Sequence, residues 1–221
     1  MQHTKIEWVR NEDGSPGYSW NPIKGLCPEA CFYCYARAMY RRFKKPAGLL
    51  LASGLIGKHG PPPSGSRIFA CSTMELFHPA IPGGWRDWIF GEIESYPDLT
   101  FIILTKRPER IDRPMPDNVW LGVSITGAED WKRLLDLSKV SARIKFVSLE
   151  PFLGDIPIIS PVFKPDWVIV GRLTGYGKKR DPSTHAIQRM VDQAWFLRIP
   201  IFLKDNLKDI WGGPLIQEFP R

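Results

Sequence analysis

Three of the four cysteines fall within one short segment, and their spacing is typical of ligands to an iron–sulfur cluster. Residues 27–34 read Cys-Pro-Glu-Ala-Cys-Phe-Tyr-Cys, which places Cys27, Cys31 and Cys34 in a C-x3-C-x2-C pattern. Thiolates are the ordinary ligands of such clusters. Three of them can each bind one iron of a [4Fe–4S] cube and leave the last iron without a protein ligand. That open iron could chelate the amino and carboxylate groups of S-adenosylmethionine (SAM).

Two other interpretations of the cysteines stay open at this point. A zinc site would use the same thiolates with another ligand, such as Cys71 or a histidine, but zinc sites usually contain paired C-x2-C units and no second pair occurs here. Three unrelated buried cysteines would be unusual at this density in one proline-flanked segment. The spacing therefore favours a cluster with SAM.

Several nearly continuous apolar runs indicate the strands that must position this segment. Such runs are typical of parallel strands buried on both faces, and the stretches between them carry apolar residues at helical spacing. The expected strands are residues 18–22, 67–71, 100–105, 119–124, 144–149, 166–171 and 199–204. The expected helices are residues 30–43, 85–96, 128–139 and 184–197.

Alternation of strands and helices predicts a parallel α/β fold. Because seven strands are too few for a closed eight-stranded barrel, we expect a partial (β/α)6 barrel. The whole chain, 1–221, is expected to form one domain. Its Gly-, Pro- and Ser-rich segment 46–66 is expected to form a surface loop or lid.

Polar residues follow the apolar runs at the point where each strand ends. In parallel α/β folds this carboxyl edge of the sheet carries the active site. The residues concerned are Ser72, Thr73, Glu75, Lys106, Ser124, Ser148 and Glu150. We therefore expect them to face one common site.

Composition and net charge limit the cellular location and the binding partners that we expect for this protein. The chain has 30 Lys and Arg against 23 Asp and Glu, a net charge of +7. This positive surplus favours a polyanionic partner such as DNA, RNA or a nucleotide. Alternatively, the surplus serves only to keep the protein soluble. No apolar stretch is long enough to span a bilayer, and residues 1–8 lack the apolar core of a signal peptide. We expect a cytoplasmic protein without membrane contact, and a monomer because no sustained heptad pattern occurs.

The pattern around the cysteines resembles the radical SAM superfamily, in which an aromatic residue, here Tyr33, precedes the last cysteine. Over about residues 18–206 the chain is similar to an uncharacterised phage- and prophage-associated branch of that superfamily. The segments that carry the likeness are Trp20-Asn21-Pro22, Cys34-Tyr35-Ala36, Met74-Glu75-Leu76-Phe77-His78, residues 104–110, residues 118–124, Ser148-Leu149-Glu150-Pro151 and residues 166–171. The resemblance implies a [4Fe–4S] cluster, SAM as cosubstrate, an external one-electron donor and release of a 5′-deoxyadenosyl radical.

Roles for individual residues follow from the resemblance and from their chemistry. The resemblance implies that Tyr33 lies near the adenine of SAM. Ser72, Thr73 and Glu75 offer acceptors for the methionyl ammonium, and Ser124 or Ser148 suits the ribose hydroxyls. Glu75 is equally compatible with an ordinary carboxylate at a helix start.

Three residues are interpreted less specifically. Lys106 can hold the SAM carboxylate or a substrate phosphate, or can be a solvated surface cation. Glu150 is expected to face the site as a catalytic residue. Cys71 can quench a substrate radical by donating a hydrogen atom, although a single cysteine in a strand is more often core packing.

Three functions remain. The leading one is a radical SAM enzyme that modifies or repairs nucleic acid or a nucleotide. The second is a radical SAM enzyme acting on a peptide or a small metabolite. The third is a non-catalytic nucleic-acid binder with a metal or cluster.

Overall fold

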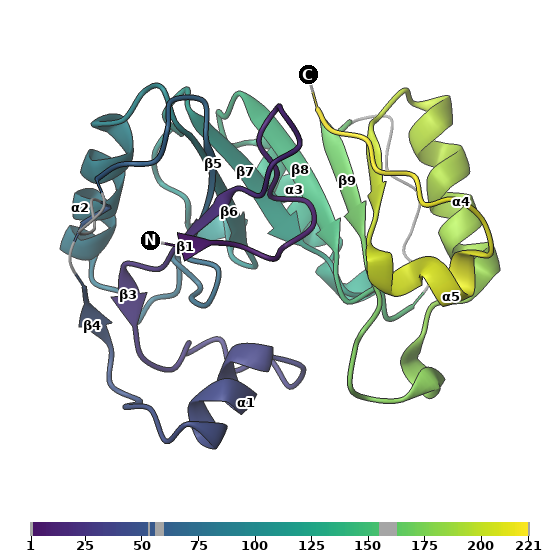
Figure 1. The fold of residues 1–221 in the computed structure, drawn as a ribbon, viewed down its shortest axis with the longest axis horizontal. Coiled ribbons are helices and arrows are strands. Elements are labelled where there is room, and N and C mark those ends of the chain that lie inside the picture. Colours follow the sequence, from purple (N-terminus) through teal and green to yellow (C-terminus); the bar gives the residue numbers. More distant parts are fainter. Residues whose placement is uncertain (1, 53, 56–59, 155–162, 221) are drawn as a thin grey trace.

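The computed structural model of the protein describes residues 2–52, 54–55, 60–154 and 163–220. Its centre is an eight-stranded sheet in the order β1-β2-β5-β6-β7-β8-β9-β10 (Figure 1). The strands are β1 (Gln2–His3), β2 (Tyr18–Trp20), β5 (Arg67–Ala70), β6 (Thr100–Thr105), β7 (Val119–Ser124), β8 (Ile144–Leu149), β9 (Trp167–Val170) and β10 (Ile201–Leu203). A separate antiparallel pair joins β3 (Ile23–Lys24) to β4 (Leu50–Leu51).

All strands from β2 to β10 in the large sheet are parallel, and each pairs with the next one along the chain. The α/β class with a mostly parallel sheet is therefore confirmed. Because parallel neighbours need a crossover, the chain returns along the sheet between strands. The α-helices are α1 (Tyr35–Arg42), α2 (Gly83–Glu94), α3 (Lys132–Ser138), α4 (Thr184–Phe196) and α5 (Lys208–Trp211). Short 3-10 turns occupy η1 (Pro108–Arg110), η2 (Ala128–Asp130), η3 (Lys178–Arg180) and η4 (Asp205–Leu207).

The two faces of the sheet bury different sets of residues. Strand residues such as Ile103 and Val168 pack with Ile89 of α2, Leu137 of α3 and Ile187 of α4 in the larger hydrophobic cluster. The opposite, inner face is covered by the segment before β2, which crosses in front of the sheet in Figure 1.

The inner face has an aromatic core of its own. Trp8 is 2% exposed and lies with its ring centroid 4.8 Å from that of Phe69 and 6.2 Å from those of Phe146 and Trp167. Gly122 leaves room for the Phe146 ring, because a Cβ at residue 122 would come within 2.3 Å of it. Large aromatic side chains thus cover this face of the sheet, whereas helices cover the other face.

Segments near the two termini lie at both borders of the sheet, one beside β2 and the other beside β10. On one side β1 pairs antiparallel with β2. On the other, the Leu203 N–H donates to the Ile216 carbonyl at 2.7 Å and the Glu218 N–H donates to the Ile201 carbonyl at 3.0 Å. These segments therefore satisfy backbone groups that β2 and β10 would otherwise present to solvent.

The segment expected as a surface loop or lid, 46–66, is more structured than the sequence indicated. Leu50 and Leu51 form β4, and Leu55 is fully buried in the larger cluster. Residues 53 and 56–59 of that segment lie outside the described residues. Among the described helices, none has the length and apolar character needed to cross a bilayer.

Candidate active site

The loop that carries Cys27, Cys31 and Cys34 connects β3 to α1 and ends at the helix, where Cys34 is the N-cap residue. Cys34 has an extended backbone (φ −68°, ψ 112°) and its side chain makes no capping hydrogen bond. Ala30 has a positive φ of 55°, which turns the chain between the first two cysteines. All three thiols are free and partly exposed. The predicted helix 30–43 therefore begins only at Tyr35, because the preceding residues form this loop.

Glu75 links the cysteine loop to the carboxyl ends of β5 and β6. Its backbone N–H donates to Cys27 Sγ at 3.3 Å. Its carboxylate is buried and accepts hydrogen bonds from Thr105 Oγ1 at 2.5 Å, the Lys106 N–H at 2.7 Å and the Phe77 N–H at 3.2 Å. Burial raises the pKa of Glu75, and the bond from Thr105 opposes that shift most strongly. The carboxylate is thus already committed to three donors from its own chain.

The thiols of the loop differ in their surroundings. Burial raises the pKa of Cys27, and the hydrogen bond from the Glu75 N–H works in the opposite direction. Burial also raises the pKa of Cys31, where the Lys106 ammonium is the main influence favouring the thiolate. Lys106 Nζ lies 5.8 Å from the ring centroid of Tyr33, so the cation and the aromatic ring flank the same loop. Lys106, predicted either to hold the SAM carboxylate or a substrate phosphate or to be a solvated surface cation, therefore lies next to the cysteines.

Ser72 and Thr73 are held by Asn21, which follows β2. Asn21 Nδ2 donates to Ser72 Oγ at 3.0 Å, and Asn21 Oδ1 accepts from the Thr73 N–H and the Thr73 hydroxyl, each at 3.1 Å. Asn21 thus ties the ends of the neighbouring strands β2 and β5 together. Its structural role was missed in the sequence, where Trp20-Asn21-Pro22 was recognised only as a motif.

Ser124 and Ser148 are direct neighbours across β7 and β8. Both are buried, and the fully enclosed Ser148 Oγ finds no hydrogen-bond partner among the residues that the structure describes. An unpaired buried hydroxyl costs free energy, so it is a candidate contact for a bound group. The Ser124 carbonyl accepts a hydrogen bond of 2.8 Å from Arg133 Nη1.

Glu150 follows β8 and forms an ion pair with Lys204, which follows β10. Both side chains are largely buried, with Lys204 14% and Glu150 29% exposed. Gly171, after β9, makes room for them, because a Cβ there would lie 2.8 Å from Lys204 Cδ. The structure brings Glu150 to the carboxyl edge, as expected, but already paired with a cation.

Cys71 lies directly after β5 with a positive φ of 58° and is buried in the cluster shared with the helices. Its N–H donates to the Trp20 carbonyl at 2.8 Å. Burial raises the pKa of the Cys71 thiol to about 12, so it stays protonated. A protonated thiol can donate a hydrogen atom, and the apolar surroundings equally suit core packing.

The loop after β9 reaches the cysteine loop, a contact that the sequence did not reveal. Tyr176 Oη donates to the Phe32 carbonyl at 2.7 Å, and the two rings meet edge to face with centroids 6.0 Å apart. These residues are 144 positions apart in the chain. Figure 1 shows this loop and α1 projecting on the same side of the molecule.

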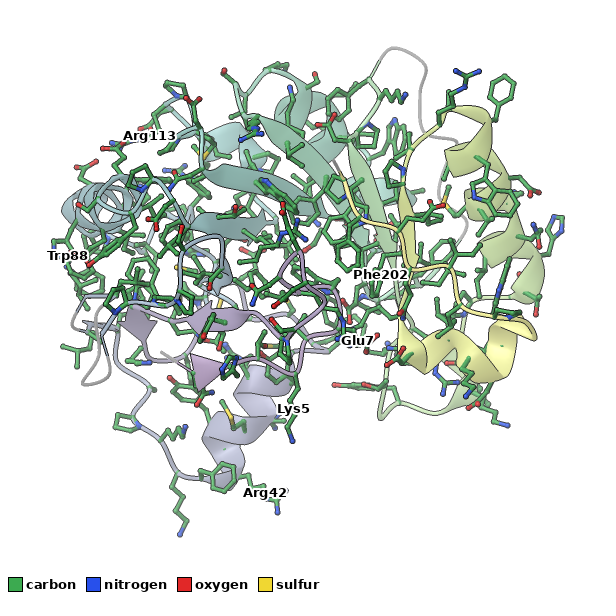
Figure 2. The ribbon with its side chains drawn as sticks, turned by 45° about the horizontal axis from the view of Figure 1, so that its top comes forward. Lys5, Glu7, Arg42, Trp88, Arg113 and Phe202 are labelled. Carbon is green, nitrogen blue, oxygen red and sulfur yellow. The ribbon has the colours of Figure 1, made fainter. Side chains whose placement is uncertain are left out.

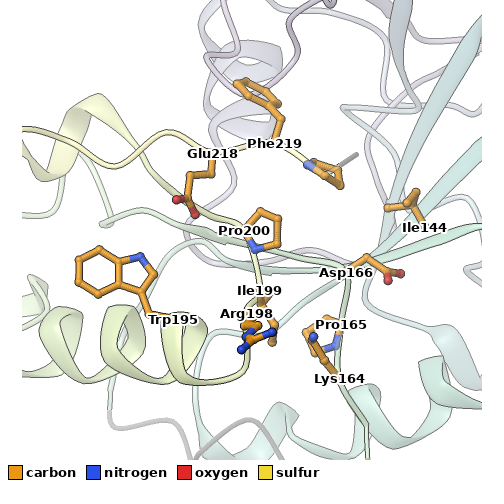
Figure 3. Close-up of a pocket in the computed structure, with 11 residues that line it drawn as sticks. Ile144, Lys164, Pro165, Asp166, Trp195, Arg198, Ile199, Pro200, Glu218 and Phe219 are labelled. Carbon is orange, nitrogen blue, oxygen red and sulfur yellow. The ribbon is translucent and has the colours of Figure 1, made fainter.

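Two pockets are relevant to the position of the site. A pocket of about 310 Å³ adjoins the cysteine loop and is lined by charged residues, among them Lys106 and the ion pair between Arg107 and Glu29 at 2.6 Å. A larger one, of about 820 Å³, lies at the opposite edge of the sheet, where Asp166 and Pro200 precede β9 and β10 (Figure 3). Figure 3 shows Trp195 of α4 and Glu218 of the C-terminal segment around it. Neither the cysteines nor the other predicted site residues line the larger pocket.

The donor set of the cysteine loop fits a thiolate-ligated cluster. It provides free thiols, a backbone N–H directed at one sulfur and a cation that favours a second thiolate. Within the described ranges, no three Cys, His, Asp or Glu side chains are gathered in the arrangement of a metal site. Binding one cluster would therefore require the loop to draw its three sulfur atoms together.

The fold and the site define an α/β protein with a three-cysteine loop at the carboxyl edge of a sequentially ordered parallel sheet. Residues 3–213 match the family model described as "Protein of unknown function (DUF5131)". The chain belongs to that family. No curated protein and no solved structure matched it.

Proposed function

We propose that this protein is a radical SAM enzyme that acts on nucleic acid or a nucleotide. The observation that carries the proposal is the C-x3-C-x2-C loop with free thiols at the carboxyl edge of the sheet. The sequential order of the parallel strands supports a partial (β/α)6 barrel of the radical SAM type. In this arrangement Cys27, Cys31 and Cys34 hold a [4Fe–4S] cluster.

With SAM and one electron from an external donor, a cluster held by these cysteines would supply reductive cleavage of the sulfonium C5′–S bond, which gives methionine and a 5′-deoxyadenosyl radical. The chain's own residues provide the setting. Glu75 donates its N–H to Cys27 Sγ and fixes the backbone at Lys106 through its carboxylate. Lys106 and Tyr33 flank Cys31, where the ammonium favours the thiolate and can hold a carboxylate of SAM.

The other predicted site residues are given roles according to whether their polar groups already have partners within the chain. The Ser148 hydroxyl, which has no partner within the described part of the chain, lies on the inner face and suits a ribose hydroxyl, with Ser124 beside it. Glu150 and Lys204 act as a preformed ion pair at the same edge, and Asn21 fixes Ser72 and Thr73. The proposal places the protein in the cytoplasm as a monomer, where reducing conditions keep its thiols free.

The decisive experiment loads the full-length protein with iron and sulfide under anaerobic conditions. We expect a brown protein with the broad visible absorption of a [4Fe–4S] cluster which, once reduced, converts SAM to 5′-deoxyadenosine and methionine. Changing Cys27, Cys31 or Cys34 singly to Ser should remove most of the cluster absorption. Cys71→Ser should retain that absorption, because Cys71 is not among the proposed ligands.

The zinc interpretation predicts the opposite pattern. A colourless protein that binds zinc, loses zinc when Cys71 is changed and leaves SAM intact would overturn the proposal. Cluster absorption without any SAM cleavage would also contradict it.

A further inference from the structure

Two long stretches of the chain contain no acidic residue, and both reach the surface beside the cysteine loop. No Asp or Glu occurs between Glu29 and Glu75, and none between Asp166 and Asp181. The first stretch contains α1, whose exposed Arg41 and Arg42 occupy its last turn. Figure 2 shows Arg42 pointing outward at the end of α1.

The second stretch contributes its own exposed cations. Residues 174–180, after β9, are all exposed, and they include Lys178, Lys179 and Arg180. Arg180 lies with its guanidinium carbon 4.8 Å from the centroid of the Phe32 ring. Arg180 therefore contacts the cysteine loop directly, and Lys178 and Lys179 precede it in the same exposed loop.

Exposed aromatic rings lie among these cations. Phe32 is 56% exposed and Tyr176 is 47% exposed, although large aromatic side chains are normally buried. Phe32 stands between Cys31 and Cys34 in the sequence, and the Tyr176 hydroxyl donates to its carbonyl. We call Phe32, Tyr176, Lys178, Lys179 and Arg180 the aromatic-basic cluster.

Such a cluster has the two components of a single-strand binding surface. Cations track the phosphates, and an exposed ring provides a face on which an unstacked base can lie. A duplex keeps its bases stacked inside, so it offers no free base face to rings at the protein surface. Neither stretch contributes a carboxylate that would repel a polyanion at this cluster.

We propose that the aromatic-basic cluster binds single-stranded nucleic acid, with one base stacked on Phe32 or Tyr176 and the neighbouring phosphates on Lys178, Lys179 and Arg180. The inference rests on the proposed function, because a nucleotide bound next to the cysteine loop is a substrate only if that loop carries the proposed chemistry. It narrows the substrate class from nucleic acid or nucleotide to a single strand.

The test measures fluorescence anisotropy of labelled single-stranded DNA, single-stranded RNA and the matching DNA duplex with the full-length protein. We expect the protein to bind the single strands more tightly than the duplex. Its affinity for the single strands should fall steeply between about 50 and 200 mM salt. Changing Phe32 and Tyr176 together to Ala should weaken single-strand binding by about 5- to 150-fold, the range that corresponds to the loss of one base–aromatic stack. Tyr176→Phe should keep most of the affinity, because it keeps the ring.

A matched pair of triple variants separates local contacts from net charge. Changing Lys178, Lys179 and Arg180 to Gln should reduce the magnitude of the slope of log K against log salt by about 2, since each phosphate contact contributes about 0.7. The control changes the exposed residues Arg143, Lys164 and Arg198 to Gln, removing the same charge at the opposite edge of the sheet. The control should leave the slope nearly unchanged.

The inference is overturned if duplex binds as tightly as single strands, if the Phe32 and Tyr176 double variant binds normally, or if both triple variants lower the slope equally. Its failure is distinguishable from failure of the proposed function. SAM cleavage without strand binding would contradict the inference alone, and strand binding without SAM cleavage would contradict the proposed function alone.

Discussion

At the scale of single residues, Glu75 combines two possible tasks that the sequence could not separate. The sequence indicated either a contact to SAM or a carboxylate at a helix start. In the structure its carboxylate accepts three hydrogen bonds from Thr105, Lys106 and Phe77, and its N–H reaches Cys27. The geometry thus makes it a brace between the ends of β5 and β6 even in the absence of a ligand.

Glu75→Gln should therefore destabilise the protein without SAM. The amide offers one accepting oxygen in place of two, so at least one buried donor loses its partner, at about 1–3 kcal/mol of unfolding free energy. Urea unfolding of the cluster-free protein measures this loss. Glu109→Gln is the control. Glu109 is 43% exposed, and its ion pair with Arg107 is long at 4.0 Å. The substitution should therefore change the free energy of unfolding by less than about 0.5 kcal/mol. Equal stability of both variants would contradict the bracing role.

The sequence revealed site residues whose position follows from the strand pattern alone, and it did not reveal contacts between segments that lie far apart in the chain. The polar residues at the strand ends were predictable, because parallel strands bring their carboxyl ends to one edge regardless of detail. The contact between Tyr176 and Phe32 was not predictable, because two loops far apart in the chain create it. Asn21 was missed for the same reason, since its partners Ser72 and Thr73 follow the next strand of the large sheet.

At the scale of elements, the apolar runs predicted the parallel strands closely. The expected ranges 100–105, 119–124 and 144–149 agree with β6, β7 and β8, because fully buried strands need nearly uninterrupted apolar sequence. The two-residue strands β1, β3 and β4 carry no such signal and were missed. Helix α1 was predicted too long, because the turn at Ala30 and the extended Cys34 depend on the loop rather than on helical periodicity.

Helix α1 is weakly anchored by its own packing. Ala36 is its one buried residue, whereas α4 buries five, among them Ile187 and Met190. A short helix without a core-facing stripe has little stability of its own. Its N-cap, Cys34, is one of the proposed cluster ligands, so ligation would fix the first turn.

Amide hydrogen exchange should show this coupling. Without iron, peptides covering 27–42 should exchange faster than those of α4, because local opening costs less where fewer apolar contacts must break. Reconstitution of the cluster should slow exchange in 27–42 and leave α4 almost unchanged. Mass spectrometry of the two states measures both. No change in 27–42 would show that the loop does not carry the cluster, and equal slowing of the two regions would contradict the local coupling between ligation and α1.

At the scale of the whole molecule, the two faces of the sheet are covered by different means. Helices cover one face, and aromatic side chains with the segment before β2 cover the other. Trp8 is central to the second arrangement, packed against Phe69, Phe146 and Trp167. The N-terminal segment is therefore part of the core.

Trp8→Ala should lower the free energy of unfolding by about 3–5 kcal/mol, because it leaves a large cavity among rings that cannot close over it. Thermal and urea unfolding measure the loss. Trp195→Ala provides the control, since Trp195 is 54% exposed on α4 and its removal should cost far less. If the two substitutions cost the same, the inner face does not depend on the N-terminal segment.

The chain-terminal segments along β2 and β10 also affect how copies of this protein meet one another. A row of free N–H and C=O groups on an outer strand can template the addition of a strand from another chain, the first step toward fibres. Here β1 occupies one such row, and Ile216 and Glu218 bond to backbone groups of the other. The terminal segments of each molecule thus cover backbone groups of β2 and β10, the two borders at which sheets of separate molecules could otherwise pair.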